Sequence, residues 1–93
     1  MYVEGMPAGI PSVLATDDLV NRLRELRKRK VLTQEQIAGL TEIDQSDYSK
    51  IELGKRNLTF EQCRRLAIAL ETSMDYLANM TDNPIPYERI IDN

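Results

Sequence analysis

Apolar residues recur at three- and four-residue spacings in several short stretches of the chain, a pattern typical of helices that bury one face. Thr16 or Asp17 can cap the first stretch, whose leucines Leu19, Leu23 and Leu26 share that face. We expect this helix to run to about residue 30. Its cationic last turn suits the negative end of the helix dipole.

Two later stretches begin with the same signature, a threonine followed three residues on by a glutamine. Thr33 with Gln36 predicts the start of a second helix, and Thr59 with Gln62 predicts the start of a fourth. Between them, Asp44 fits the N-cap of a third helix. The side chains expected inside are Ile37, Ala38, Leu40 or Thr41, Tyr48, Ile51, Phe60, Cys63, Leu66, Ala67, Leu70, Met74 and Leu77.

Turn residues divide the chain into three parts. Gly54 fits a left-handed terminator of the third helix, and Ser73 fits the cap of a short fifth helix. Residues 1–16 are rich in glycine and proline and read as an extended arm, whereas residues 81–93 read as an irregular tail. The five helices between them, over residues 17–80, predict an all-α domain.

Composition narrows the class of protein. The 93 residues make one domain at most, and a core of this size would gain stability from dimerisation. No apolar run is long enough to span a bilayer and the first residues carry no secretory signal, so we expect no membrane partner and a cytoplasmic protein. The single cysteine, Cys63, excludes an internal disulfide.

Catalysis and metal binding find no support in the sequence. The chain has no histidine, and one thiol does not build a zinc site. A small core also leaves little room for a pocket with paired carboxylates. We therefore expect no enzyme activity and no cofactor.

The formal net charge of -3 argues against a nucleic-acid partner at first sight, but its distribution does not. The segment from Arg22 to Lys30 holds six cations and one anion, Glu25. Binding to a phosphate backbone depends on the local field of one face of the protein and not on the charge of the whole chain.

Two short helices joined by a turn of three or four residues are a device for reading DNA, with the second helix in the major groove. The stretch from Thr33 to Glu52 has this spacing. Around it the chain reads TQEQIAGLTEIDQSDYSKIELGKRNLTFEQCRRLAIAL. Over about residues 19–79 it resembles the phage Cro/repressor (xenobiotic-response-element) helix-turn-helix family, which implies a five-helix lambda-repressor-like domain. Glu42 and Glu71 stand where this family often has glycine.

The third helix carries the candidate base contacts. Gln45 lies at its exposed start, where a glutamine can pair with adenine N6 and N7, and the resemblance assigns base reading to the same position. Ser46, Ser49 and Lys50 lie opposite the inward residues and are further candidates for base contact. The alternative is that these are solvated polar side chains.

Phosphate contacts are expected on both sides of this helix. Gln34 begins the second helix, where free backbone N–H groups favour an anion, and the resemblance implies a backbone contact there. Lys55, Arg56 and Asn57 follow the third helix in a loop. Capping chemistry for Gln34 and a solvated basic turn for the loop are the alternatives.

The resemblance also implies an ion pair between the first and third helices, at Arg27 and Glu52, and a homodimer formed near the last helices. The dimer candidates are Ile68, Met74, Tyr76, Leu77 and Met80. In the tail, Ile85, Tyr87, Ile90 and Ile91 form either a docking strip or a segment folded back on its own domain.

These observations predict a homodimeric, sequence-specific binder of double-stranded DNA that regulates transcription, in particular a repressor, from a palindromic operator. Phage, mobile-element, restriction-controller and antitoxin operons all stay open. The alternative is a protein-interaction module that keeps the fold with little DNA binding, such as an antitoxin that holds a toxin through residues 81–93. The acidic net charge and Glu42 favour that alternative, whereas Gln34, Gln45 and the Lys55–Arg56 pair count against it.

Overall fold

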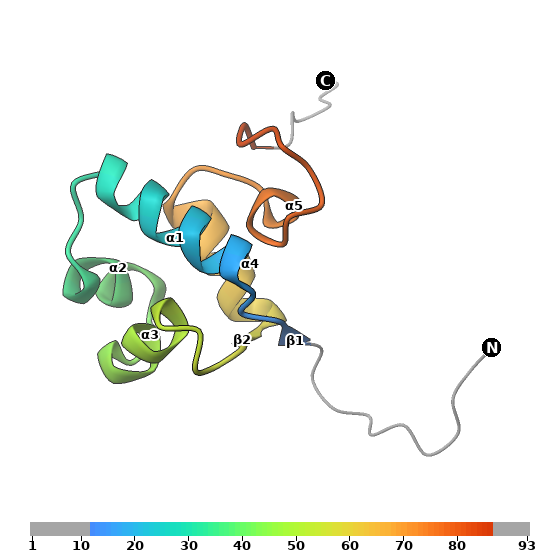
Figure 1. Ribbon diagram of the computed structural model, residues 1–93. Helices are drawn as coiled ribbons and strands as arrows, with labels where there is room; N and C mark the ends of the chain where they lie inside the picture. The colour runs from blue at the N-terminus through green and yellow to red at the C-terminus, as the bar shows by residue number, and fades with distance from the viewer. Residues whose placement is uncertain (1–11, 87–93) are drawn as a thin grey trace, which may run out of the picture.

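The computed structural model describes residues 12–86 of the chain. Within them five helices and a two-stranded sheet follow one another: β1 (Ser12–Val13), α1 (Asp17–Arg29), α2 (Gln34–Thr41), α3 (Gln45–Glu52), β2 (Leu58–Thr59), α4 (Phe60–Ala69) and α5 (Met74–Leu77). Figure 1 shows α2 and α3 together at one side of the domain, α1 running diagonally across α4 beside them, and α5 at the far end. This is the predicted five-helix helix-turn-helix architecture, with a small sheet added.

Each predicted N-cap forms as the sequence indicates. The capping residues of the five helices in the described part of the chain are Thr16, Thr33, Asp44, Thr59 and Ser73. In the first capping box the Gln36 backbone N–H donates to Thr33 Oγ1 at 3.0 Å, and the Thr33 N–H donates to Gln36 Oε1 at 2.8 Å. The Thr59–Gln62 box repeats this at 3.0 and 2.9 Å. Two otherwise unpaired backbone donors are satisfied at each start.

All five described helices also end in the same way, with one residue in the left-handed region. These residues are Val31, Glu42, Gly54, Glu71 and Asn79, with φ between 57° and 74°. After each one, the next N–H reaches back to a carbonyl of the last helical turn, as Ile43 N–H does to Ala38 O at 3.0 Å. Four of the five bear a side chain, and one of them, Glu42, takes this conformation in the turn between α2 and α3.

The end of the N-terminal arm makes a contact that the local sequence pattern did not predict. Ser12 and Val13 pair with Thr59 and Leu58 as two antiparallel strands. The Ala15 N–H extends this contact by donating to Asn57 Oδ1 at 3.0 Å. The end of the arm is therefore tied to the loop that follows α3.

The core lies between the helices and corrects two expectations. Leu77 is fully buried because the single turn of α5 packs against α1 and α4. Its side chain therefore cannot contact a second copy of the protein, and the prediction that it lies in a dimer interface is wrong. Phe60 is 50 % exposed, because it is the first residue of α4 and lies outside the core, so it does not join the buried stripe. The core residues are Leu19, Leu23, Ile37, Ala38, Ile43, Tyr48, Ile51, Leu58, Cys63, Leu66, Ala67, Leu70 and Leu77.

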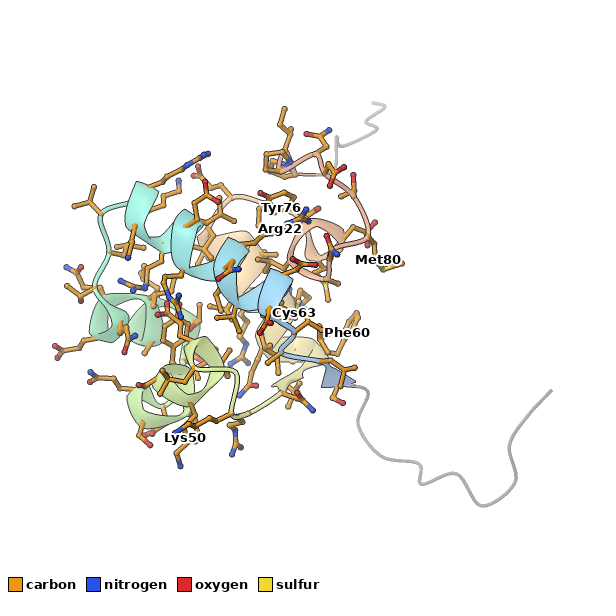
Figure 2. All side chains as sticks on the ribbon, viewed as in Figure 1. Arg22, Lys50, Phe60, Cys63, Tyr76 and Met80 are labelled. Carbon is orange, nitrogen blue, oxygen red and sulfur yellow. The ribbon has the colours of Figure 1, made fainter. Side chains whose placement is uncertain are left out.

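Arg22 of α1 fastens the beginning of the tail. Its Nη1 donates to the carbonyl oxygens of Tyr76 at 2.7 Å and Thr81 at 2.8 Å, and its guanidinium lies 4.2 Å from the centre of the Tyr76 ring (Figure 2). Thr72 Oγ1 donates to Pro84 O at 2.6 Å. Residues 81–86 are thus held against their own domain. The remaining members of the predicted strip, Tyr87, Ile90 and Ile91, lie outside the described residues.

Candidate DNA interface

Helix α3 is anchored through one face and open on the other. Tyr48 and Ile51 are fully buried, while Gln45, Ser46 and Lys50 are exposed. Figure 2 shows Lys50 pointing away from the body of the domain. At 100° per residue, the exposed set lies largely opposite the buried set, so α3 presents a polar surface supported from behind.

Asp44 fixes the start of α3. Its Oδ2 accepts hydrogen bonds from the backbone N–H groups of Ser46 at 3.0 Å and Asp47 at 3.4 Å. The side chains of Gln45 and Ser46 therefore project from a capped helix end. Ser49, the remaining predicted base contact, is partly buried.

Leu53 adds an apolar group that our list of base contacts omitted. It follows α3 directly and is 61 % exposed on the side of Lys50. Leucine at such a position offers the kind of apolar contact that the methyl group of thymine accepts in the major groove. Helical spacing predicts this outward position, since it places Leu53 with Ser46 and Lys50 opposite the buried residues of α3.

The predicted phosphate contacts are exposed or partly exposed around α3, but two of them already have protein partners. The Gln34 amide Nε2 donates to Glu52 Oε1 at 2.8 Å, which leaves its carbonyl oxygen and one N–H. Asn57 uses Oδ1 for the arm and keeps its NH₂ group. Lys55 and Arg56 are exposed in the loop after α3.

A buried ion pair links α1 to the end of α3. Arg27 Nε lies 2.6 Å from Glu52 Oε2 and its Nη2 lies 3.2 Å from Oε1, while Nη1 donates to Leu32 O at 2.8 Å. The Tyr48 hydroxyl donates to the same carboxylate at 2.5 Å. The side chain of Glu52 is only 2 % exposed and that of Arg27 12 %. Gln34, Arg27 and Tyr48 together satisfy this carboxylate and fix α3 relative to α1 and α2.

The network sets the protonation states of its members. Burial alone would raise the pKa of Glu52, but the hydrogen bonds from Arg27, Tyr48 and Gln34, together with the charge of Arg27, lower it below its usual value. The hydrogen bond to Glu52 raises the pKa of Arg27. Burial, reinforced by the neighbouring carboxylate, raises the pKa of Tyr48. The pair is therefore ionised and Tyr48 is a permanent donor at neutral pH.

Three cations, Lys50, Lys55 and Arg56, lie on α3 and its following loop, beside the carboxylates of Asp44 and Asp47. Within residues 12–86, Lys50 and Lys55 make no ion pair, and Arg56 approaches only one carboxylate, at 3.8 Å. The arginines of α4, by contrast, are held by Glu61, whose pKa their hydrogen bonds lower to about 2. At the α3 edge these three cations thus outnumber the carboxylates of Asp44 and Asp47, although the whole chain is acidic.

Metal binding and thiol chemistry find no support in the described residues. Over residues 12–86 no group of three histidine, cysteine or acidic side chains is placed to hold a metal ion. Cys63 is buried, and this burial raises the pKa of its thiol to about 11, so little thiolate forms at neutral pH. No helix in this part of the chain is long and apolar enough to cross a membrane.

Comparison with curated proteins finds relatives of this segment. The chain is 37 % identical over 65 residues to the uncharacterized HTH-type transcriptional regulator YobD of Bacillus subtilis (strain 168), and the match spans 70 % of this chain and 58 % of that protein. It is 36 % identical over 58 residues to the control protein C.MunI of a Mycoplasma species, covering 61 % of this chain and 78 % of that protein.

Solved structures give the same picture. The restriction-modification controller protein C.AhdI of Aeromonas hydrophila matches with a TM-score of 0.62 at 38 % identity, over 64 % of this chain and 91 % of that one. The hypothetical transcription factor NHTF from Neisseria shares the fold, with a TM-score of 0.64 at 24 % identity, over 78 % of this chain and 83 % of that one. The model of the family described as helix-turn-helix domain matches residues 20–82. The chain therefore belongs to the helix-turn-helix family and is of the Cro/repressor type.

Proposed function

We propose that the chain binds double-stranded DNA as a homodimer and represses transcription from a palindromic operator. The observation that carries this proposal is the α3 surface, which is polar and braced by the buried Arg27–Glu52 pair, and which carries Lys50 and Lys55 without an ion pair to any residue from 12 to 86. A short helix with these properties fits the major groove with its first residues against base edges. We also propose a cytoplasmic location, where the DNA of its bacterial relatives lies.

In this proposal the two kinds of contact have separate tasks. Gln45 reads an adenine through its amide, and Ser46, Ser49 and Lys50 contact neighbouring bases. The start of α2 offers free backbone N–H groups and the remaining polar atoms of Gln34 to one phosphate. The loop residues Lys55, Arg56 and Asn57 approach phosphates further along the backbone. These phosphate contacts fix the register without carrying sequence information directly.

The dimer is proposed to form through the outer surface of α4 and α5. Ile68 is 63 % exposed and Met80 76 %, while Met74 and Tyr76 are partly buried. The exposed Phe60 projects outward at the α4 end of the domain (Figure 2) and joins these candidates. A two-fold dimer places two reading helices about 34–36 Å apart, one helical turn of DNA.

Among the operon classes, a restriction-modification system is the one that the relatives favour. C.AhdI and C.MunI are matched over 91 % and 78 % of their lengths, so a domain of this size accounts for most of each controller protein. The rival proposal is a protein-interaction module, such as an antitoxin. A measurement of DNA binding distinguishes the two proposals, because the interaction module would bind little or no DNA.

The decisive experiment is selection of bound sequences from a random duplex pool, followed by a salt series. A DNA-binding protein loses affinity as the salt concentration rises. Its log Kd changes linearly with the logarithm of the salt concentration, with a slope proportional to the number of phosphates that it neutralises. Gln45→Ala should then cost about 1–3 kcal/mol and relax preference at one base pair. Lys55→Ala is the matched comparison, because loss of a phosphate contact weakens all sequences alike. If wild-type protein binds no duplex up to high concentration, the interaction module replaces this proposal.

The dimer is tested separately by light scattering. Ile68→Glu should convert the dimer to monomer because it places a charge in an apolar interface. Leu40→Glu is the matched control, because Leu40 is 64 % exposed on α2, outside the proposed interface. An unchanged mass for the Ile68 variant would remove this surface from the proposal.

A further inference from the structure

The reading helix carries an acidic side chain that the contacts proposed above do not use. Asp47 is the third residue of α3 and its side chain is 31 % exposed. It lies between the exposed Ser46 and the buried Tyr48, so at 100° per residue it stands at the edge of the surface that faces away from the core. A carboxylate there repels every phosphate that approaches α3, and this repulsion lowers affinity for any duplex.

The contacts of Asp47 leave its carboxylate open. Its backbone N–H donates to Asp44, which belongs to the helix cap. Its Oδ1 lies 3.8 Å from Arg56 Nη1, beyond hydrogen-bond distance, and the two side chains are 31 % and 49 % exposed. The lone pairs of Asp47 thus remain free to accept hydrogen bonds. Arg56 is drawn alongside α3 instead of extending from its loop, and its charge is partly offset.

The donors and acceptors on the base edges determine which base can donate a hydrogen bond to this carboxylate. Cytosine offers an N4 amino donor in the major groove without a neighbouring acceptor. Adenine places the acceptor N7 beside its N6 donor, guanine presents O6 and N7, and thymine presents O4. A carboxylate is repelled by each of these acceptors, so among the four bases it favours cytosine.

We propose that Asp47 is a specificity-determining residue, whose carboxylate accepts a hydrogen bond from the N4 amino group of an operator cytosine and, with Arg56, weakens binding to unrelated duplex. This inference rests on the proposed function. On an unrelated sequence the carboxylate meets acceptors and phosphates, and it competes with them for Arg56. On the operator its repulsion is offset by the cytosine contact.

The test compares Asp47→Asn with Asp17→Asn in the full-length protein. Asp17 is exposed at the start of α1, makes no ion pair within residues 12–86, and its substitution changes the net charge equally. Each variant is titrated with the selected operator, with its single-base variants and with a random duplex of the same length. Asp47→Asn should bind the random duplex about 3–10-fold more tightly, with a salt slope steeper by up to about 0.9, the contribution of one phosphate. It should also lose most of the preference for cytosine at one position, a change of about 5-fold or more.

Two outcomes separate the possible failures. If Asp47→Asn and Asp17→Asn behave alike on all three kinds of DNA, this inference is wrong while the proposed function stands. If the wild-type protein binds none of them, the proposed function is wrong. The part played by Arg56 is read from Asp47→Asn in an Arg56→Ala background, where the gain in salt slope should disappear. Asp47→Ser, which keeps a good residue for a first helical turn, must reproduce the loss of cytosine preference.

Discussion

The ion pair between Arg27 and Glu52 offers the sharpest test of how the reading helix is held. The substitution Arg27→Met keeps an unbranched apolar stem in the same space and removes the guanidinium. The variant loses two hydrogen bonds to Glu52, at 2.6 and 3.2 Å, and one to Leu32 O at 2.8 Å. It leaves a carboxylate that is 2 % exposed with only the more distant Arg24, whose Nε lies 4.0 Å from Glu52 Oε1, as counter-charge. Breaking a buried pair from one side costs about 3–5 kcal/mol.

The expected cost lies at the lower end of that range. Glu52 keeps two neutral donors, the Tyr48 hydroxyl and the Gln34 amide, so it is not fully orphaned. We therefore expect Arg27→Met to lower the free energy of unfolding by about 3 kcal/mol. In a domain of this size that corresponds to a fall in Tm of about 12–24 °C. A loss of this size is a large part of the total stability of a small domain, about 5–15 kcal/mol.

The assay is urea denaturation followed by circular dichroism, with Glu52→Gln and the double variant completing a thermodynamic cycle. Glu52→Gln in the Arg27→Met background removes the uncompensated charge, so the double variant should be more stable than Arg27→Met alone. The midpoint should shift with an unchanged m value. A change below about 0.5 kcal/mol for Arg27→Met, or a coupling of that size in the cycle, would refute the reasoning that the pair braces α3.

Three further predictions follow from the same structure. Because the pKa of Glu52 is lowered in the folded state, its contribution to stability is complete above the unfolded-state pKa of about 4.3 and is lost as the pH falls through the lower folded value; acid titration of the unfolding free energy should show a loss that Glu52→Gln reduces. Val31 is a β-branched residue at φ 58° and is 85 % exposed, so Val31→Gly should raise the free energy of unfolding by about 0.5–1 kcal/mol, measured by thermal melting. A lower free energy of unfolding would contradict the argument that the valine backbone is strained. Cys63, buried and with a pKa of about 11, should resist a thiol reagent at pH 8 until urea unfolds the domain, so rapid labelling of folded protein would contradict its placement in the core.

Local chemistry was enough to place the helices and the candidate reading surface. Caps such as Thr33 and Asp44 bond to groups within three residues, so their effect is present in the sequence itself. The turn at Glu42 is closed just as locally, by a hydrogen bond from Ile43 to Ala38, but the left-handed conformation of Glu42 was not evident from a sequence without glycine there. The identification of α3, and of Gln45 at its exposed end, followed from this short-range order and from the family resemblance together.

Packing decided the rest. Arg22 is one of six cations between residues 22 and 30, and nothing near it in the sequence indicates its partners Tyr76 and Thr81, which are 54 and 59 residues away in the chain. The burial of Leu77 and the engagement of Gln34 with Glu52 likewise depend on which helices meet. An amphipathic pattern indicates which side chains face the core, but it does not identify the residues that they contact. Contacts between distant segments form only when the helices pack around a common core.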